Sequence, residues 1–116
     1  MADHWIKRGD TAPFIRSTLL DYAGDPIDIA GAYVTFIMRS IRGDIVVEAP
    51  ASNDQVDLGQ DGSKGYVSYE WLSGDTDTEG GYYAEWEVDF LSGERETFPN
   101  DGHITVAIVT DLGDGS

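Results

Sequence analysis

The sequence predicts an all-β domain in which short strands pack in two layers. Two segments show the period-two alternation of apolar residues that is typical of half-buried strands. The alternating residues are Val67, Tyr69 and Trp71 in the first segment and Tyr82, Ala84, Trp86 and Val88 in the second. Clusters of Gly, Asp and Pro recur at roughly ten-residue spacing, and no segment keeps a helical period of about 3.6 residues. These observations favour a β-sandwich.

Residues 11–20 form the first predicted strand, with Pro13 near its start, where a missing amide hydrogen is tolerated. Residues 21–31 are rich in Asp and Gly and predict a connection. Residues 32–39 predict a strand, because apolar and polar side chains alternate along them. Arg42-Gly43-Asp44 then predicts a turn.

Two short strands are predicted next, over residues 45–49 and 53–58, with Pro50 ending the first of them. Residues 64–72 predict a longer strand, which contains the first alternating segment. The Gly-rich stretch between the second and third of these strands predicts a turn.

The last three predicted strands cover residues 81–91, 94–98 and 103–110. Gly80 precedes Tyr82 by two residues at the head of the first of them, as at the corner of an immunoglobulin-like sandwich, where a tyrosine hydroxyl bonds to upstream backbone. The chain is therefore predicted to be an immunoglobulin-like β-sandwich of about seven to nine short, mostly antiparallel strands.

The length of 116 residues suits one such domain. We assign residues 1–10 to an N-terminal arm, residues 11–110 to the sandwich and residues 111–116 to an acidic C-terminal tail. The chain has no cysteine, which excludes disulfides and thiolate metal sites. Its first residues lack the apolar run of a signal peptide, so we expect synthesis in the cytoplasm.

The composition is strongly acidic, with a formal net charge of −15. Such a charge repels phosphate groups, so nucleic acid is not an expected direct partner. The longest apolar stretch is too short to cross a bilayer, and no membrane association is expected.

The sequence predicts no catalytic residues and therefore no enzyme. His4 and His103 stand beside no serine nucleophile or Gly-rich elbow. Glu85, Glu87 and Asp89 share one side of a strand, but this is the expected polar face of a sandwich strand rather than an acid–base pair.

No cofactor is predicted, and structural calcium is the one metal ion left open. Ca²⁺ is bound by oxygen ligands such as carboxylates, and acidic side chains cluster in two of the predicted connections. The clusters are Asp21, Asp25 and Asp28 in one, and Asp75, Asp77 and Glu79 in the other. Neither follows the calcium-loop pattern, and Asp in a turn commonly bonds its own backbone.

The candidate contact residues are aromatic or lie in the arm. They are Trp5, Ile6, Lys7 and Arg8 in the arm, and Tyr33, Tyr66 and Tyr83 on the polar sides of their strands. Exposed tyrosines fit a protein interface and a carbohydrate interface equally well. The arm is either an anchoring hook or a terminal strand that lies on its own domain.

The chain resembles the N-terminal immunoglobulin-like domain of the upper baseplate proteins of tailed bacteriophages. Four segments carry the resemblance, in order along the chain. They are Gly24-Asp25-Pro26-Ile27-Asp28-Ile29 with Val34, Phe36 and Met38; Gly65-x-Val67-x-Tyr69-x-Trp71; Asp77-Thr78 with Gly80-x-Tyr82-x-Ala84-Glu85-Trp86-x-Val88; and Ser92-Gly93 with Thr97-Phe98-Pro99 and Ile104-x-Val106-x-Ile108.

The resemblance implies a structural component of the virion that acts by protein–protein docking. Its expected partners are other virion structural proteins, in multiple copies within a symmetric assembly. Two alternatives stay open at this point: a carbohydrate-binding module for attachment to the host surface, and a capsid decoration or neck protein. In each case the protein would be made in the host cytoplasm, and in the leading case it would reside in the virion.

Overall fold

The computed structural model describes residues 3–55, 60–99 and 102–110. Within them the chain forms ten strands and one short 3₁₀ helix. They are β1 (His4–Lys7), β2 (Ile15–Thr18), β3 (Tyr33–Ser40), β4 (Ile45–Pro50), β5 (Asp54–Gln55), β6 (Gln60–Asp61), η2 (Gly62–Lys64), β7 (Tyr66–Tyr69), β8 (Gly80–Asp89), β9 (Arg95–Phe98) and β10 (Ile104–Val109). The predicted all-β fold is confirmed. The predicted tail, 111–116, and most of the predicted strand 53–58 lie outside the described residues.

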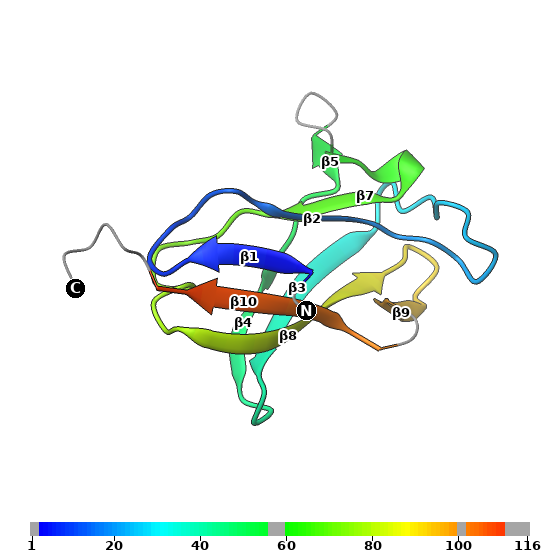
Figure 1. The fold of residues 1–116 in the computed structure, drawn as a ribbon. Coiled ribbons are helices and arrows are strands. Elements are labelled where there is room, and N and C mark those ends of the chain that lie inside the picture. Colours follow the sequence, from blue (N-terminus) through cyan, green and yellow to red (C-terminus); the bar gives the residue numbers. More distant parts are fainter. Residues whose placement is uncertain (1–2, 56–59, 100–101, 111–116) are drawn as a thin grey trace.

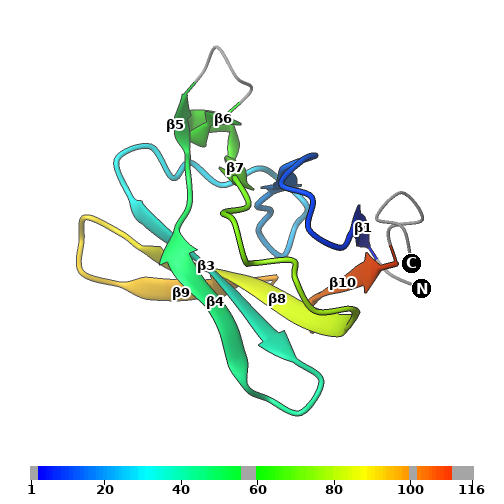
Figure 2. The same ribbon diagram turned by 90° about the vertical axis from the view of Figure 1, so that its left-hand side faces the viewer.

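The strands form two facing layers and a separate two-stranded ribbon of β5 and β6. The large sheet has the order β1-β10-β8-β3-β4, with β9 also paired to β8, and the small facing sheet consists of β2 and β7. Figures 1 and 2 show β2 and β7 lying on one side of the large sheet. Among the described residues every strand pair is antiparallel except β1 with β10, as the sequence predicted for most strands.

Strand β8 is the centre of the large sheet. The whole of β3 pairs with it, from Tyr82 opposite Ser40 to Asp89 opposite Tyr33. The other edge of β8 pairs first with β10 and then with β9. Ala84 lies opposite Ile104 of β10, and Trp86 lies opposite Phe98 of β9. The last strand is thus broken between residues 98 and 104, where the sequence predicted a break at Pro99 to Gly102.

The core fills the space between the two layers. The even-numbered residues of β8 from Tyr82 to Val88 face inward and are buried, as the alternation predicted. Trp86 and Phe36 are both fully buried, with ring centroids 5.0 Å apart. Trp71 meets Phe36 edge to face at 5.6 Å. These ring contacts, together with aliphatic neighbours, hold the two layers together by burying aromatic surface.

The predicted tyrosine corner is present. The hydroxyl of Tyr82 donates to the carbonyl of Thr78 at 2.6 Å, just before β8 begins. Burial raises the pKa of this hydroxyl, so it stays a protonated donor. The bond ties the start of β8 to the preceding loop, which fixes where the strand enters the sheet.

The N-terminal segment forms part of the sheet. Residues 4–7 pair in parallel with β10, and Ile6 lies opposite Ile108. Ile6 is only 3% exposed. Of the two alternatives for the arm, the structure has the terminal strand that lies on its own domain.

Replacing Ile6 with Ala should therefore lower the free energy of unfolding by about 2–4 kcal/mol, because the change leaves a cavity in the core. Urea denaturation measures this difference. Trp5→Ala is the matched control, since the neighbouring side chain is 57% exposed and should cost much less. Equal losses in the two variants would show that β1 does not contribute its inner face to the core.

Replacing Tyr82 with Phe should cost about 1–2 kcal/mol, because the carbonyl of Thr78 loses its hydroxyl donor. Tyr83→Phe, one position along the same strand and on the exposed side, should change stability by less than about 0.5 kcal/mol. Chemical denaturation of both variants tests the corner, and a Tyr83→Phe loss as large as that of Tyr82→Phe contradicts it.

Candidate functional site

The outer face of the large sheet carries a group of exposed apolar side chains. Trp5 in β1 lies opposite Ala107 in β10, and Ala107 lies opposite Gly81 in β8. A Cβ built on Gly81 would lie 3.8 Å from Cγ2 of Ile41, which therefore stands over the glycine. Trp5 and Ile41, with exposed fractions of 57% and 66%, thus flank two small residues. The row thus places two small residues between two large exposed apolar side chains on the outer face of the sheet.

A second row continues this surface. Thr105 lies opposite Tyr83, which lies opposite Arg39, which lies opposite Ile45. Tyr83 and Ile45 are both exposed. We call the six residues Trp5, Ile41, Ile45, Gly81, Tyr83 and Ala107 the outer patch. Its members come from five different strands and turns, and only the sheet brings them together.

Hydrogen bonds fix the position of β1 and so of Trp5. The Asp3 amide donates to the Thr105 carbonyl at 2.9 Å, and the Thr105 amide donates to the Asp3 carboxylate at 2.9 Å. The pKa of Asp3 is held below its usual range, mainly by the hydrogen bond from the Thr105 amide and secondly by the bond from the Thr105 hydroxyl. At the other end of β1, the Arg8 amide donates to the Val109 carbonyl.

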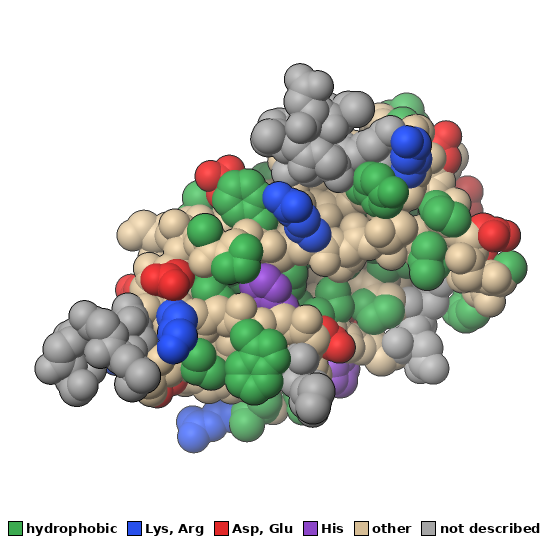
Figure 3. Space-filling view, turned by 45° about the horizontal axis from the view of Figure 1, so that its top comes forward, with side chains coloured by type: hydrophobic (Ala, Val, Ile, Leu, Met, Phe, Trp, Pro, Cys, Tyr) green, Lys and Arg blue, Asp and Glu red, His purple; other side chains and the backbone are tan. Residues whose placement is uncertain are grey.

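Two arginines of the described surface are held in ion pairs with carboxylates. Arg95 pairs with Asp89 at 2.7 Å and with Glu87 at 3.6 Å, and Arg8 lies 3.7 Å from Glu79. In the view of Figure 3, hydrophobic side chains form separate groups, and basic side chains stand singly among them. These ion pairs neutralise Arg8 and Arg95 locally, and the net charge of −15 makes the surface predominantly negative.

The predicted contact residues are not all in one place. Trp5 and Tyr83 belong to the outer patch, with Lys7 exposed beside them on β1. Ile6 cannot contact a partner, because its side chain is in the core. Arg8 is engaged with Glu79.

The remaining predicted tyrosines lie apart from the outer patch. Tyr33 is on the same face but opposite Asp89, at the far end of β8. Tyr66 belongs to β7 in the other sheet. Tyr33, Tyr66 and Tyr83 therefore form no single stacking platform for a sugar.

The sequence analysis did not identify four members of the outer patch, which are Ile41, Ile45, Gly81 and Ala107. The alternation in β8 could have placed Gly81 on the outer face, because it is an odd-numbered residue of a strand whose even-numbered residues from Tyr82 onward are buried. Ile41 lies at the start of the turn that follows β3, and Ile45 is the first residue after it, where alternation says little about the direction of a side chain.

The histidines and carboxylates form no reactive group in the described residues. His4 shares the inner side of β1 with Ile6, and its ring lies 5.9 Å from that of Trp71. The ring of His103 instead lies 3.9 Å from that of Tyr83, on the outer side. Glu87 and Asp89 pair with Arg95 on the outer face.

The architecture defines an immunoglobulin-like β-sandwich, and the comparisons with known proteins agree with that class. A solved structure, that of CopC from Methylosinus trichosporium OB3b, matches with a TM-score of 0.54 and 14% sequence identity. The match covers 95% of this chain and 86% of the other. At this identity the likeness shows the fold alone. No family model and no curated protein matches the chain, so the resemblance to the upper baseplate family stays a prediction.

The expected role as a structural component of a bacteriophage particle is corrected by this comparison. CopC, a protein of the same fold, gives no support to a virion role, and no matching protein links the chain to a phage baseplate, tail, neck or capsid. The expectation arose because short sandwich motifs such as Gly80-x-Tyr82 and the alternating strands form the fold itself. Such motifs carry over between proteins of different function.

The expectation that the chain takes no cofactor is corrected on the same ground, because CopC binds copper. The described residues do not fit such a site. Nowhere among them do three His, Cys, Asp or Glu side chains come together. His4 and His103 lie on opposite faces of the large sheet and cannot hold one ion. We derive no metal chemistry from this chain.

In both acidic clusters considered for calcium, carboxylates accept hydrogen bonds from donors nearby in the sequence. Asp21 accepts from the amides of Ala23 and Asp25, and Asp28 accepts from the amide of Ala30. Asp75 accepts from the Tyr69 hydroxyl and the Leu72 amide. These bonds shape the turns, as Asp commonly does.

The described residues contain no helix long and apolar enough to cross a membrane.

Acid should destabilise the domain partly through His4. Its Nε2 is buried without a partner among the described atoms, and burial lowers the pKa of its imidazole. The unfolded chain binds the proton at a higher pH, so stability falls as pH drops below about 6.5. Between about pH 7.5 and about pH 5.5, His4→Phe should therefore lose less stability than the wild type in urea denaturation.

His103→Gln is the matched control, because it keeps the buried ring of His4 and should keep the full acid sensitivity. An unchanged pH dependence in His4→Phe would show that the buried imidazole is not the source.

Proposed function

We propose that the domain is a non-catalytic docking module that binds a protein partner through the outer patch. The observation that carries this proposal is the row in which exposed Trp5 and Ile41 flank Ala107 and Gly81. Exposed apolar groups of this kind, with polar surroundings, are typical of interaction surfaces. Trp and Tyr are also the residues that most often dominate binding energy.

The row is suited to receive one apolar side chain of a partner. Ala107 and Gly81 leave room between the two larger side chains, and all four lie on or beside paired strands. Since the sheet holds them in place before binding, little conformational entropy is lost on association.

The charge of the domain indicates the character of the partner. At a net charge of −15, two copies repel each other, whereas a basic protein is attracted and guided toward the surface. The partner is therefore a basic protein surface with an apolar centre. Its association should weaken as salt is added, because screening removes the long-range attraction.

Site-specific photo-cross-linking tests the proposal. A photoreactive amino acid at position 41, on the outer patch, should cross-link a discrete basic protein in a lysate of the source cells. The same group at position 72 is the control, since Leu72 is also exposed but lies after β7. Mass spectrometry identifies the partner and the contacted residue.

Competition makes the result specific. Unlabelled wild type should suppress the cross-link, whereas Trp5→Ala and Gly81→Gln should compete at least about tenfold less well. Gly81→Gln is compatible with the fold, because the nearest atom to an added Cβ is 3.8 Å away. Equal competition by all three proteins, or an equal cross-link from position 72, would refute docking through the outer patch.

A further inference from the structure

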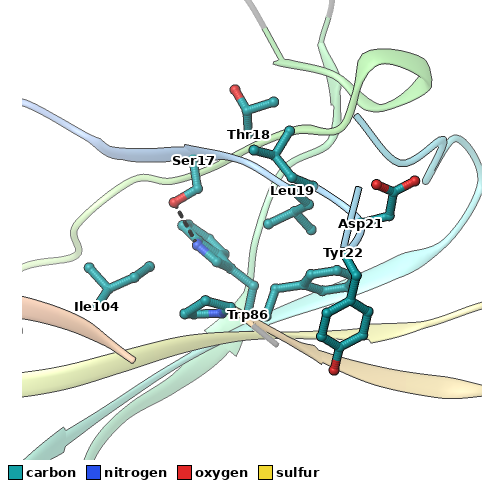
Figure 4. Close-up of a pocket in the computed structure, with 10 residues that line it drawn as sticks. Ser17, Thr18, Leu19, Asp21, Tyr22, Trp86 and Ile104 are labelled. Atoms are coloured by element: carbon teal, nitrogen blue, oxygen red, sulfur yellow. Dashed lines mark hydrogen bonds between the residues drawn. The ribbon is translucent and has the colours of Figure 1, made fainter. Parts of the chain in front are cut away.

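A pocket of about 370 Å³ opens between the two layers, away from the outer patch. One side is formed by the end of β2 and the following loop, including Ser17 and Tyr22. The other side is formed by Trp86, Phe98 and Ile104 of the large sheet. Figure 4 shows Ile104 and Tyr22 on opposite sides of Trp86, with Ser17 above its indole ring.

The break in the last strand creates this opening. Phe98 is the last residue of β9 to pair with β8, and Ile104 is the first of β10. Both stand on the inner side of the sheet, since they lie opposite the buried residues Trp86 and Ala84. The partner of β8 along this edge therefore changes from β10 to β9 between Ala84 and Trp86, and the pocket lies beside this change of partner.

The floor of the pocket is rigid and its walls are open to a ligand. Trp86 and Phe98 are at most 2% exposed, so they form the floor. Tyr22, at 87% exposed, and the half-buried Ile104 form walls that a ligand can contact. A volume of this size is within the lower range of small-molecule sites.

The polar groups indicate the chemistry of the ligand. The Trp86 Nε1–H donates to Ser17 Oγ at 2.8 Å, so the proton of the Ser17 hydroxyl remains for a ligand oxygen. Asp21, at the rim, accepts with Oδ1 from the amides of Ala23 and Asp25. No Lys, Arg or His lines the pocket among the described residues, and the domain is strongly acidic. An anion would meet repulsion without compensation.

We propose that this pocket binds a small uncharged aromatic molecule that carries one hydrogen-bond acceptor oxygen. Its ring lies between Tyr22 and Ile104 over the floor of Trp86 and Phe98, and its oxygen accepts from Ser17. The site is separate from the outer patch, so either can fail without the other.

Three matched probes test the ligand class: acetophenone, ethylbenzene, which lacks the oxygen, and benzoate, which carries a negative charge. Two-dimensional ¹H–¹⁵N NMR of the full chain follows the indole N–H of Trp86 and the amides of the pocket. Acetophenone should shift these signals in a saturable way, ethylbenzene more weakly and benzoate least. Absence of saturable shifts at the pocket with acetophenone, or benzoate binding as well as acetophenone, overturns the proposal.

Two variants connect the shifts to the pocket. Tyr22→Ala should weaken acetophenone binding by about three- to tenfold, because it removes an exposed aromatic wall at little cost to the fold. Tyr33→Ala, on the outer face, is the matched control and should bind as the wild type does. Equal binding by Tyr22→Ala and wild type would place the probe elsewhere and overturn the assignment.

Discussion

The burial of Trp86 between the two sheets is the constraint on which the rest of the structure depends. Its ring is fully buried against Phe36, and its one polar atom, Nε1, donates to Ser17 in the facing sheet. A buried N–H without a partner would cost about 1–3 kcal/mol, so this bond determines how β2 lies over β8. The position of β8 then fixes β3, β9 and β10, which all pair with it.

The two faces of β8 have different roles, one in folding and one in the proposed binding. The inner residues of β8 build the core, while its outer residues, Gly81 and Tyr83, belong to the outer patch. The sheet holds the backbone of these outer residues in place before a partner binds. The pocket beside Ser17 lies where the edge of β8 changes its partner from β10 to β9. Both proposed binding sites thus result from one sheet, on its two opposite faces.

Sequence reasoning predicted what depends on local alternation. It identified the inner residues of β8, the tyrosine corner at Tyr82 and the break after Phe98, because each follows from neighbouring residues. It could not predict that Trp5 lies beside Ala107, since register between segments a hundred residues apart leaves no local pattern. For the same reason the outer patch was only partly predicted. The function expected from resemblance failed because the matching motifs form the fold rather than a site.

The most direct test of this account is a scan of all single substitutions in β8, scored by resistance of the displayed domain to proteolysis. The account predicts alternation: substitutions at Tyr82, Ala84, Trp86 and Val88 should abolish folding in most cases. Polar substitutions at the outer positions, including Gly81 and Tyr83, should be tolerated. Tolerance of polar residues at position 86, or equal sensitivity on both sides of the strand, would contradict the division of β8 into a folding face and a binding face.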